Sequence, residues 1–143
     1  MTDTKIDKMT VLIVDDDSEI REIIKNYMIH FGFKTFLEAK DGAHAYRYVL
    51  DTRQKIDLII SDWEMPNADG LTLLRAVRGN KSRADTPFIM VTSQQSQERM
   101  KITNAKKNSV DCYIIKPFRS EILQEKVWKA LKLDEQDKIS KVS

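Results

Sequence analysis

Short apolar runs alternate along the chain with longer segments in which apolar residues recur every three or four positions. A continuous apolar run is typical of a strand buried on both faces of a parallel sheet, and the longer spacing is typical of an amphipathic helix. The predicted strands cover residues 9–14, 33–37, 56–61, 87–91 and 112–115. Helices are predicted to follow from about residues 18, 42, 70, 96 and 120. This alternation predicts an α/β fold in which helices cover both faces of a five-stranded parallel sheet.

The composition is that of one globular domain. The chain has 143 residues, of which 41% are hydrophobic and 32% are charged, and this length fits a single core. We expect residues 9–132 to form the domain, residues 1–8 to be a flexible lead, and residues 133–143 to be a polar tail that frays. A net charge of +2 gives no reason to expect nucleic-acid binding. No apolar run approaches the roughly 20 residues of a spanning helix and the N-terminus lacks a signal-peptide core, so we expect no membrane insertion and a cytoplasmic location.

Residues whose side chains can react or bind a ligand lie at the ends of four predicted strands. They are Asp15, Asp16, Asp17, Asp62, Thr92, Ser93 and Lys116. Because parallel strands all end at one edge of a sheet, we expect these side chains to lie close together, where ligands bind in open α/β sheets. Taken alone, any of the aspartates could simply cap a turn or a helix.

Carboxylates gathered at one edge repel one another. At about 4 Å, each pair costs on the order of 4 kcal/mol at an effective dielectric constant near 20. Lys116 supplies one positive charge, and a divalent cation would answer the repulsion better. Oxygen ligands without nearby His or Cys suit Mg²⁺. A metal ion, a lysine, a hydroxyl group and a free carboxylate are together suited to phosphoryl transfer, with the carboxylate as nucleophile.

Four motifs in order resemble the receiver domain of two-component response regulators, and within that family the stand-alone chemotaxis regulators of the CheY type. They are the acidic pair after the first strand, Asp62-Trp63-Glu64-Met65-Pro66 with Asp69-Gly70, Val91-Thr92-Ser93, and Lys116-Pro117-Phe118. Each motif is weak alone, but all four at successive strand ends are specific. The resemblance covers about residues 9–132 and implies the flavodoxin-like strand order 2-1-3-4-5.

The resemblance implies that Asp62 is the phosphoacceptor. It further implies that Asp15 and Asp16 bind Mg²⁺, directly or through water, together with Asp62 and the backbone carbonyl of Glu64. By the same resemblance the domain is not an ordinary enzyme but promotes its own phosphorylation and dephosphorylation. Glu64 and Gln94 occupy the positions that tune dephosphorylation in the family.

Other positions match the phosphoryl-binding and switch residues of the family. Thr92 and Ser93 would bind the phosphoryl group by hydrogen bonds, and Lys116 would form an ion pair with it. The Lys116–Pro117 peptide bond would be cis, and Tyr113 would be the switch aromatic. For Tyr113, a half-buried aromatic without a switching role is nearly as good an interpretation.

The resemblance also implies partners. The phosphoryl donor would be a phosphohistidine on a histidine kinase or a phosphotransfer protein. Because the chain ends soon after the last predicted helix, we expect a stand-alone regulator that signals by protein contacts. The expected surface combines the helix from residue 96, the strand 112–115 and the helix from residue 120, and a flagellar motor is one candidate target. Trp128 has no assignable role; it lies off the inward stripe of that last helix and could face a partner or solvent.

Two other functions compete with this interpretation. A phosphohydrolase of the haloacid-dehalogenase type would use Asp15 as its nucleophile, but that class needs an acidic pair after the lysine and leaves Asp62 without a role. A degenerate receiver that acts only as a binding module is disfavoured because the acidic, hydroxyl and lysine positions are all present. The site of phosphorylation separates the first alternative, and failure to label with a small phosphodonor would favour the second.

Overall fold

The computed structural model describes residues 4–93 and 110–133. Its five strands form one parallel sheet in the order β2-β1-β3-β4-β5, which confirms the predicted fold class and strand order. The strands are β1 (Thr10–Val14), β2 (Thr35–Ala39), β3 (Leu58–Asp62), β4 (Phe88–Thr92) and β5 (Cys112–Ile115). The helices of the described ranges are α1 (Thr4–Asp7), α2 (Ser18–Phe31), α3 (Gly42–Leu50), α4 (Gly70–Arg78) and α6 (Ser120–Leu131).

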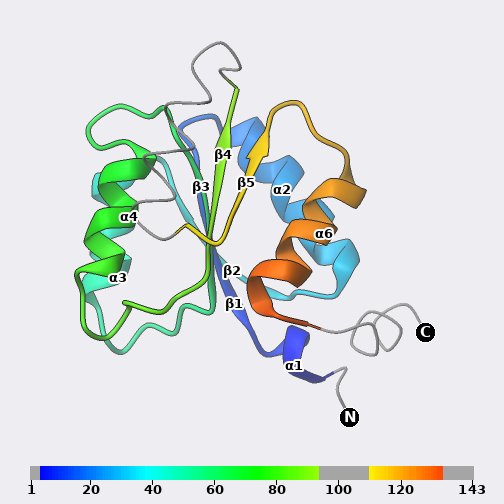
Figure 1. The fold of residues 1–143 in the computed structure, drawn as a ribbon, viewed down its shortest axis with the longest axis horizontal. Helices are drawn as coiled ribbons and strands as arrows, with labels where there is room; N and C mark the ends of the chain where they lie inside the picture. The colour runs from blue at the N-terminus through cyan, green and yellow to red at the C-terminus, as the bar shows by residue number, and fades with distance from the viewer. Residues whose placement is uncertain (1–3, 94–109, 134–143) are drawn as a thin grey trace.

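Two hydrophobic clusters hold helices to opposite faces of the sheet. Figure 1 shows α2 and α6 on one side of the sheet and α3 and α4 on the other. The first cluster joins one face of the central strands to α2 and α6, and the second joins the other face to α3 and α4. Strands β1, β3 and β4 are buried along their whole length, as nearly continuous apolar runs predict. This packing makes the carboxyl edge of the sheet, at the top of Figure 1, a fixed platform.

Aspartate side chains in the loops cap the first turns of the helices that follow β1 and β3. Asp17 caps α2 by accepting a hydrogen bond from the amide of Glu19 at 2.9 Å. Asp69 caps α4 in the same way through the amide of Thr72. These caps satisfy amides that have no partner inside their helices. The loops at the carboxyl edge are therefore anchored at both ends.

Most predicted strand boundaries shift by one or two residues in the structure, and two of the differences have a clear physical cause. The second strand begins at Thr35 rather than residue 33, because the amide of Phe33 bonds to the carbonyl of Met28 and so belongs to the C-terminal cap of α2. The expected flexible lead over residues 1–8 is wrong for its second half. There α1 forms, and Ile6 is 1% exposed within the cluster beside α2 and α6.

Helix α6 buries a wider face than the single stripe of apolar residues predicted for it. Trp128 is 2% exposed, so the expectation that it faces a partner or solvent is wrong. Its ring packs edge-on against Phe31 of α2, with 6.0 Å between the ring centroids. The reason is that α6 packs against both the sheet and α2, which widens its buried face. The predicted helix from residue 96 lies outside the described residues.

Candidate functional site

Three carboxylates converge at the carboxyl edge of the sheet. Asp15 follows β1, Asp16 comes next in the chain, and Asp62 is the last residue of β3. One carboxylate oxygen from each lies within 4.8 Å of the other two. Asp15 and Asp62 are 1% and 6% exposed, whereas Asp16 is exposed. The structure therefore brings the predicted acidic residues together, with two of them buried.

Lys116 joins the two buried carboxylates. Its Nζ lies 3.1 Å from Oδ2 of Asp15 and 3.3 Å from Oδ1 of Asp62. Its backbone amide donates to the carbonyl of Thr92 at 2.7 Å, which ties the end of β5 to the end of β4. The Lys116–Pro117 peptide bond is cis, as the resemblance implied.

The proximity of these groups perturbs their ionisation. Burial, and then the charge of Asp15, raise the pKa of Asp62 from 3.8 to about 6, although Lys116 opposes the shift. Burial also raises the pKa of Asp15 above its ordinary value. Burial lowers the pKa of Lys116, but the charges of Asp62 and Asp15 outweigh burial and raise it. Such shifts are typical of sites where charges are held close together for function.

The backbone around Asp15 is held by contacts that the sequence analysis missed. Its amide bonds to the carbonyl of Ala39 at 3.1 Å, and its carbonyl accepts a hydrogen bond from the Arg21 guanidinium at 2.6 Å. The same guanidinium is paired at 3.0 Å with Glu38 of β2. The only sequence signal was an arginine in the first turn after the acidic residues, and its partner lies 17 positions away. Arg21 therefore positions the loop that carries the acidic pair.

The loop from β3 to α4 is fixed by close backbone contact. The amide of Gly70 donates to the carbonyl of Trp63 at 2.9 Å. A Cβ at Gly70 would overlap with the backbone oxygen of Asp62, so only glycine fits without displacing the phosphoacceptor candidate. The side chain of Asn67, whose φ is 69°, donates to Asp41 at 2.9 Å and connects the loop to α3.

The other residues predicted for the site lie at the end of β4, on β5 and in the loop after β3. Thr92 ends β4 and is 2% exposed; Val91 before it is the register partner of Asp62. Ser93 is exposed beside it. Tyr113 lies in the middle of β5 and packs against the cluster below α3 and α4. Glu64 is half-buried two residues after Asp62, and Gln94 lies outside the described residues.

The donor set fits a hard divalent cation. The three clustered carboxylates offer only oxygen ligands, and two of them are buried beside a single lysine. Three carboxylates against one ammonium group leave a negative charge that a divalent cation would offset.

Among described residues, no helix has the length and apolar content to span a membrane.

Comparison with known proteins agrees with this geometry. The family model described as the response regulator receiver domain matches residues 11–128. The chain is 39% identical over 119 residues to a chemotaxis protein CheY homolog of Campylobacter jejuni, an alignment that covers 83% of this chain and 89% of the relative. It is 38% identical over 121 residues to chemotaxis protein CheY of Pseudomonas aeruginosa, covering 85% and 94% of the two chains.

Solved structures show the same relationship. The chemotaxis response regulator CheY4 of Vibrio cholerae superposes with a TM-score of 0.76 and 31% identity, covering 86% of this chain and 98% of that one. The receiver domain of the Francisella response regulator 1452 gives a TM-score of 0.71 at 34% identity, covering 87% and 98%. The chain belongs to the response regulator receiver domain family and is a CheY-like response regulator of a two-component system.

Proposed function

We propose that Asp62 accepts a phosphoryl group from a phosphohistidine, in a reaction that requires Mg²⁺. The observation that carries the proposal is the convergence of Asp15, Asp16 and Asp62 within 4.8 Å, with Lys116 paired to both buried carboxylates. The family membership supports the same conclusion.

The chain's own groups define the step. A carboxylate oxygen of Asp62 attacks phosphorus, the phosphorus–nitrogen bond of the donor breaks, and the histidine nitrogen leaves with the electron pair and takes up a proton. With a pKa of about 6, Asp62 is mostly ionised at pH 7.5 and more basic than an ordinary carboxylate. Lys116 is placed to pair with the transferred phosphoryl oxygens, and Thr92 with Ser93 would supply hydroxyl donors at the end of β4.

Mg²⁺, held by Asp15, Asp16, Asp62 and the backbone carbonyl of Glu64, would supply positive charge to the phosphoryl oxygens. Because the nucleophile and its neutralising groups belong to one site, the chain promotes its own phosphorylation and dephosphorylation, without acting on an outside substrate as an ordinary enzyme does.

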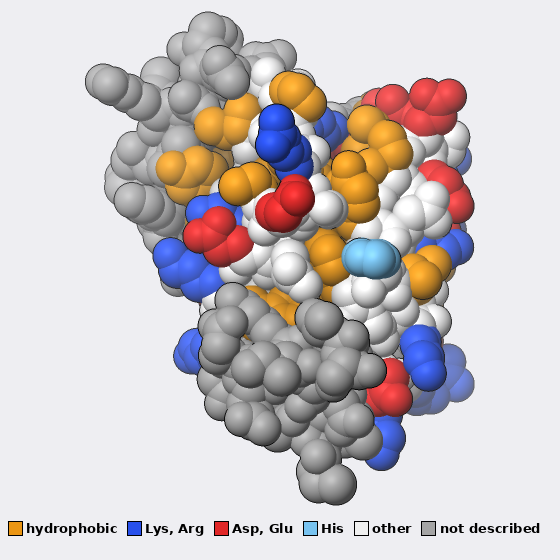
Figure 2. All heavy atoms as spheres, turned by 90° about the vertical axis from the view of Figure 1, so that its right-hand side faces the viewer, with side chains coloured by type: hydrophobic (Ala, Val, Ile, Leu, Met, Phe, Trp, Pro, Cys, Tyr) orange, Lys and Arg blue, Asp and Glu red, His pale blue; other side chains and the backbone are white. Residues whose placement is uncertain are grey.

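A docking face for the donor lies beside this site. Figure 2 shows hydrophobic side chains gathered on the face that α2 and α6 present. Ile23 and Ile122 are 45% and 42% exposed on these helices, and Tyr27 contacts Phe118 edge-on at 6.3 Å. Helix α2 begins three residues after Asp15, and Phe118 follows Lys116 by two. A histidine kinase or phosphotransfer protein seated here would bring its phosphohistidine to Asp62.

The output would be a changed protein-binding surface made by the segment from residue 96, β5 and α6, with Tyr113 as the switch. The relatives are chemotaxis proteins by name, which favours a target in the flagellar motor.

Labelling with acetyl phosphate and Mg²⁺ tests the phosphoacceptor. Intact-mass and peptide spectra should place one phosphoryl group on Asp62, and Asp62→Ala should abolish labelling. Asp85→Asn, which changes an exposed aspartate in the loop after α4, should label as the unchanged protein does. Phosphate on Asp15 would instead support a hydrolase, and labelling of Asp62→Ala would refute the proposal.

The decay of the label tests the tuning position. Glu64 places a negative charge two residues after the phosphoacceptor, so Glu64→Asn should change the phosphorylated lifetime. Equal decay rates for the two proteins would remove that role.

A further inference from the structure

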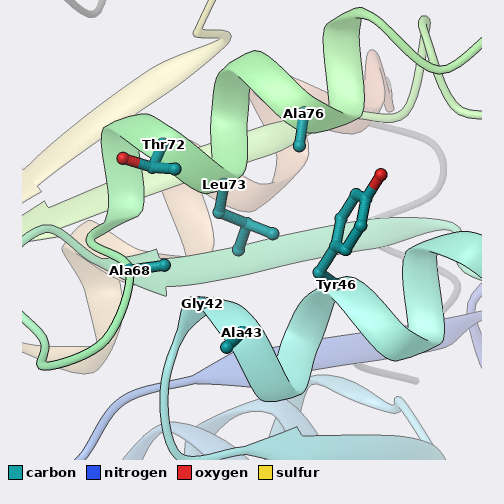
Figure 3. A pocket seen from close by; sticks show the side chains of 7 residues that line it. All are labelled: Gly42, Ala43, Tyr46, Ala68, Thr72, Leu73 and Ala76. Atoms are coloured by element: carbon teal, nitrogen blue, oxygen red, sulfur yellow. The ribbon is translucent and has the colours of Figure 1, made fainter.

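A hollow lies between α3 and α4, on the side of the sheet opposite the hydrophobic face of Figure 2. Figure 3 shows Tyr46 as one wall, Leu73 as the floor, and Ala76 on the facing helix. The hollow exists because the other side chains at this junction are small, including those of Ala43 and Ala68. Its lining is apolar apart from the hydroxyl groups of Tyr46 and of a threonine on α4. An apolar hollow of this kind fits a bulky apolar side chain.

The apolar surface continues along α3. Ala43, Tyr46 and Leu50 are spaced three and four residues apart and therefore share one side of the helix. All three are exposed, and Tyr46 and Leu50 are 40% and 53% exposed. A bound amphipathic helix presents apolar anchors at the same spacing of three and four residues. The stripe on α3 could therefore contact the anchors of such a helix.

The rim of the hollow is positively charged. Neither α3 nor α4 contains an aspartate or a glutamate, whereas α2 and α6 carry both signs. Arg47 and Arg75 are exposed on the two helices, and Lys40 is exposed just before α3. These three cations form no ion pair with any residue of the described ranges. A second depression adjoins the hollow at Ala43, and its other lining residues are Lys40, Asp41, His44, Arg47 and Asn67.

One carboxylate near the rim is already engaged. Asp41 is 4% exposed and accepts hydrogen bonds from the side chain of Asn67 and the amide of His44. These bonds lower its pKa, so it stays ionised and reduces the local positive charge by one. Asp69, the half-exposed cap of α4, offsets a second positive charge, so the three cations and two carboxylates around the hollow leave a net charge of +1.

One end of the hollow belongs to the loop that leaves the phosphoacceptor strand. The amide of Gly42 donates to the carbonyl of Ala68 at 3.0 Å, and a Cβ at Gly42 would lie 2.5 Å from that oxygen. Helix α3 is thus docked directly on this loop. An occupant of the hollow would contact the same loop that positions Asp62.

We propose that the groove between α3 and α4 binds an acidic amphipathic segment of a partner protein, which inserts one bulky apolar side chain between Tyr46 and Ala76 and pairs its carboxylates with Arg47 and Arg75. A second copy of this chain docked through the same face is a poorer occupant, because it would place like charges against each other. A nucleic acid is also a poorer occupant, because phosphates gain nothing from the apolar hollow.

The test uses the full chain labelled with nitrogen-15 and two matched probe peptides. The acidic probe is a 16-residue capped helix of Glu and Ala with two Leu residues four positions apart, and the control probe has Lys in place of each Glu. The acidic probe should shift amide resonances of residues 40–50 and 68–76, and the basic probe should not. Binding is measured without phosphorylation, so its failure would leave the proposed phosphotransfer at Asp62 unaffected.

Three variants sharpen the result. Arg47→Glu with Arg75→Glu should weaken the acidic probe by about tenfold or more, and Ala76→Trp should fill the hollow and weaken it similarly. Lys129→Glu with Lys132→Glu, an equal charge change at two exposed residues at the end of α6, should bind as the unchanged chain does. If Ala76→Trp does not fold by circular dichroism, the two surface arginine changes carry the test. Equal binding of both probes, shifts mapped elsewhere, binding insensitive to these changes, or self-association or duplex DNA binding through the same residues would overturn the proposal.

Discussion

Replacing Asp62 with asparagine should stabilise the metal-free protein at neutral pH. Asp62 is 6% exposed, and burial together with the charge of Asp15 raises its pKa from 3.8 to about 6. That difference corresponds to about 3 kcal/mol of folding free energy lost when the carboxylate is ionised. The attraction of Lys116, at 3.3 Å, is already contained in this balance. Asparagine keeps the shape of the side chain and removes the charge.

The sign of the effect fixes its pH window. Below about pH 3 the carboxyl group is mostly protonated in both the folded and the unfolded chain, so the substitution should change stability little. Between pH 3.8 and about 6 the folded chain holds a proton that the unfolded chain has lost, so the wild-type protein loses stability as pH rises. Above about pH 6 the full difference is present. The advantage of Asp62→Asn should therefore grow across this window and then stay constant.

Urea unfolding followed by far-ultraviolet circular dichroism measures this difference. The two proteins should be compared from pH 4 to pH 8 in EDTA, with Asp85→Asn as a control for loss of an exposed aspartate. At pH 8, Mg²⁺ should raise the stability of the wild-type protein more than that of Asp62→Asn, because the variant lacks one ligand. A stability difference that does not change with pH, or a variant less stable than the wild type at pH 8, would refute the reasoning.

Three further substitutions test contacts that hold the fold together, each by the free energy of urea unfolding. Arg83→Ala should cost about 3 kcal/mol, because the buried guanidinium donates to four backbone carbonyls in the last turn of α3 and the loop after it; a cost below about 1 kcal/mol would contradict this account. Gly70→Ala should cost about 2 kcal/mol or more and slow phosphorylation, because the new Cβ meets the backbone oxygen of Asp62; unchanged stability and labelling would show that the loop yields freely. Ile6→Ala should cost about 2–4 kcal/mol because Ile6 is 1% exposed; a neutral change would restore the flexible lead.

Much of the fold and the site follows from the order of apolar runs and polar strand ends. A parallel sheet brings all its strand ends to one edge, so the convergence of Asp15, Asp62 and Lys116 needed no knowledge of distances. Turn chemistry was partly readable: Asp17, one of the aspartates that could cap a turn or a helix, caps α2. The cap of α4 by Asp69 was not predicted. These features depend on local sequence and on topology alone.

What escaped prediction depends on partners far apart in the chain. Ile6 is an isolated apolar residue in a polar segment, and only the assembled cluster beside α2 and α6 shows why it is buried. Trp128 falls outside a single helical stripe and is buried because Phe31 reaches it from α2. Arg21 meets Glu38 across 17 positions, and no periodicity predicts that pairing. Helix patterns assume one buried face, and that assumption fails where a helix packs against two neighbours.

The geometry of the site is held by the backbone rather than by the carboxylates themselves. Burial of Asp15 and Asp62 raises the pKa of each, which means that their charges oppose folding in the absence of a cation. The loops stay in place through the carbonyl of Asp15 bound to Arg21, its amide bound to Ala39, and the close approach of Gly70. A site built this way keeps its shape when a charge is removed. Asp62→Asn should therefore lose phosphorylation while gaining stability, and this separates the chemistry of the site from its scaffold.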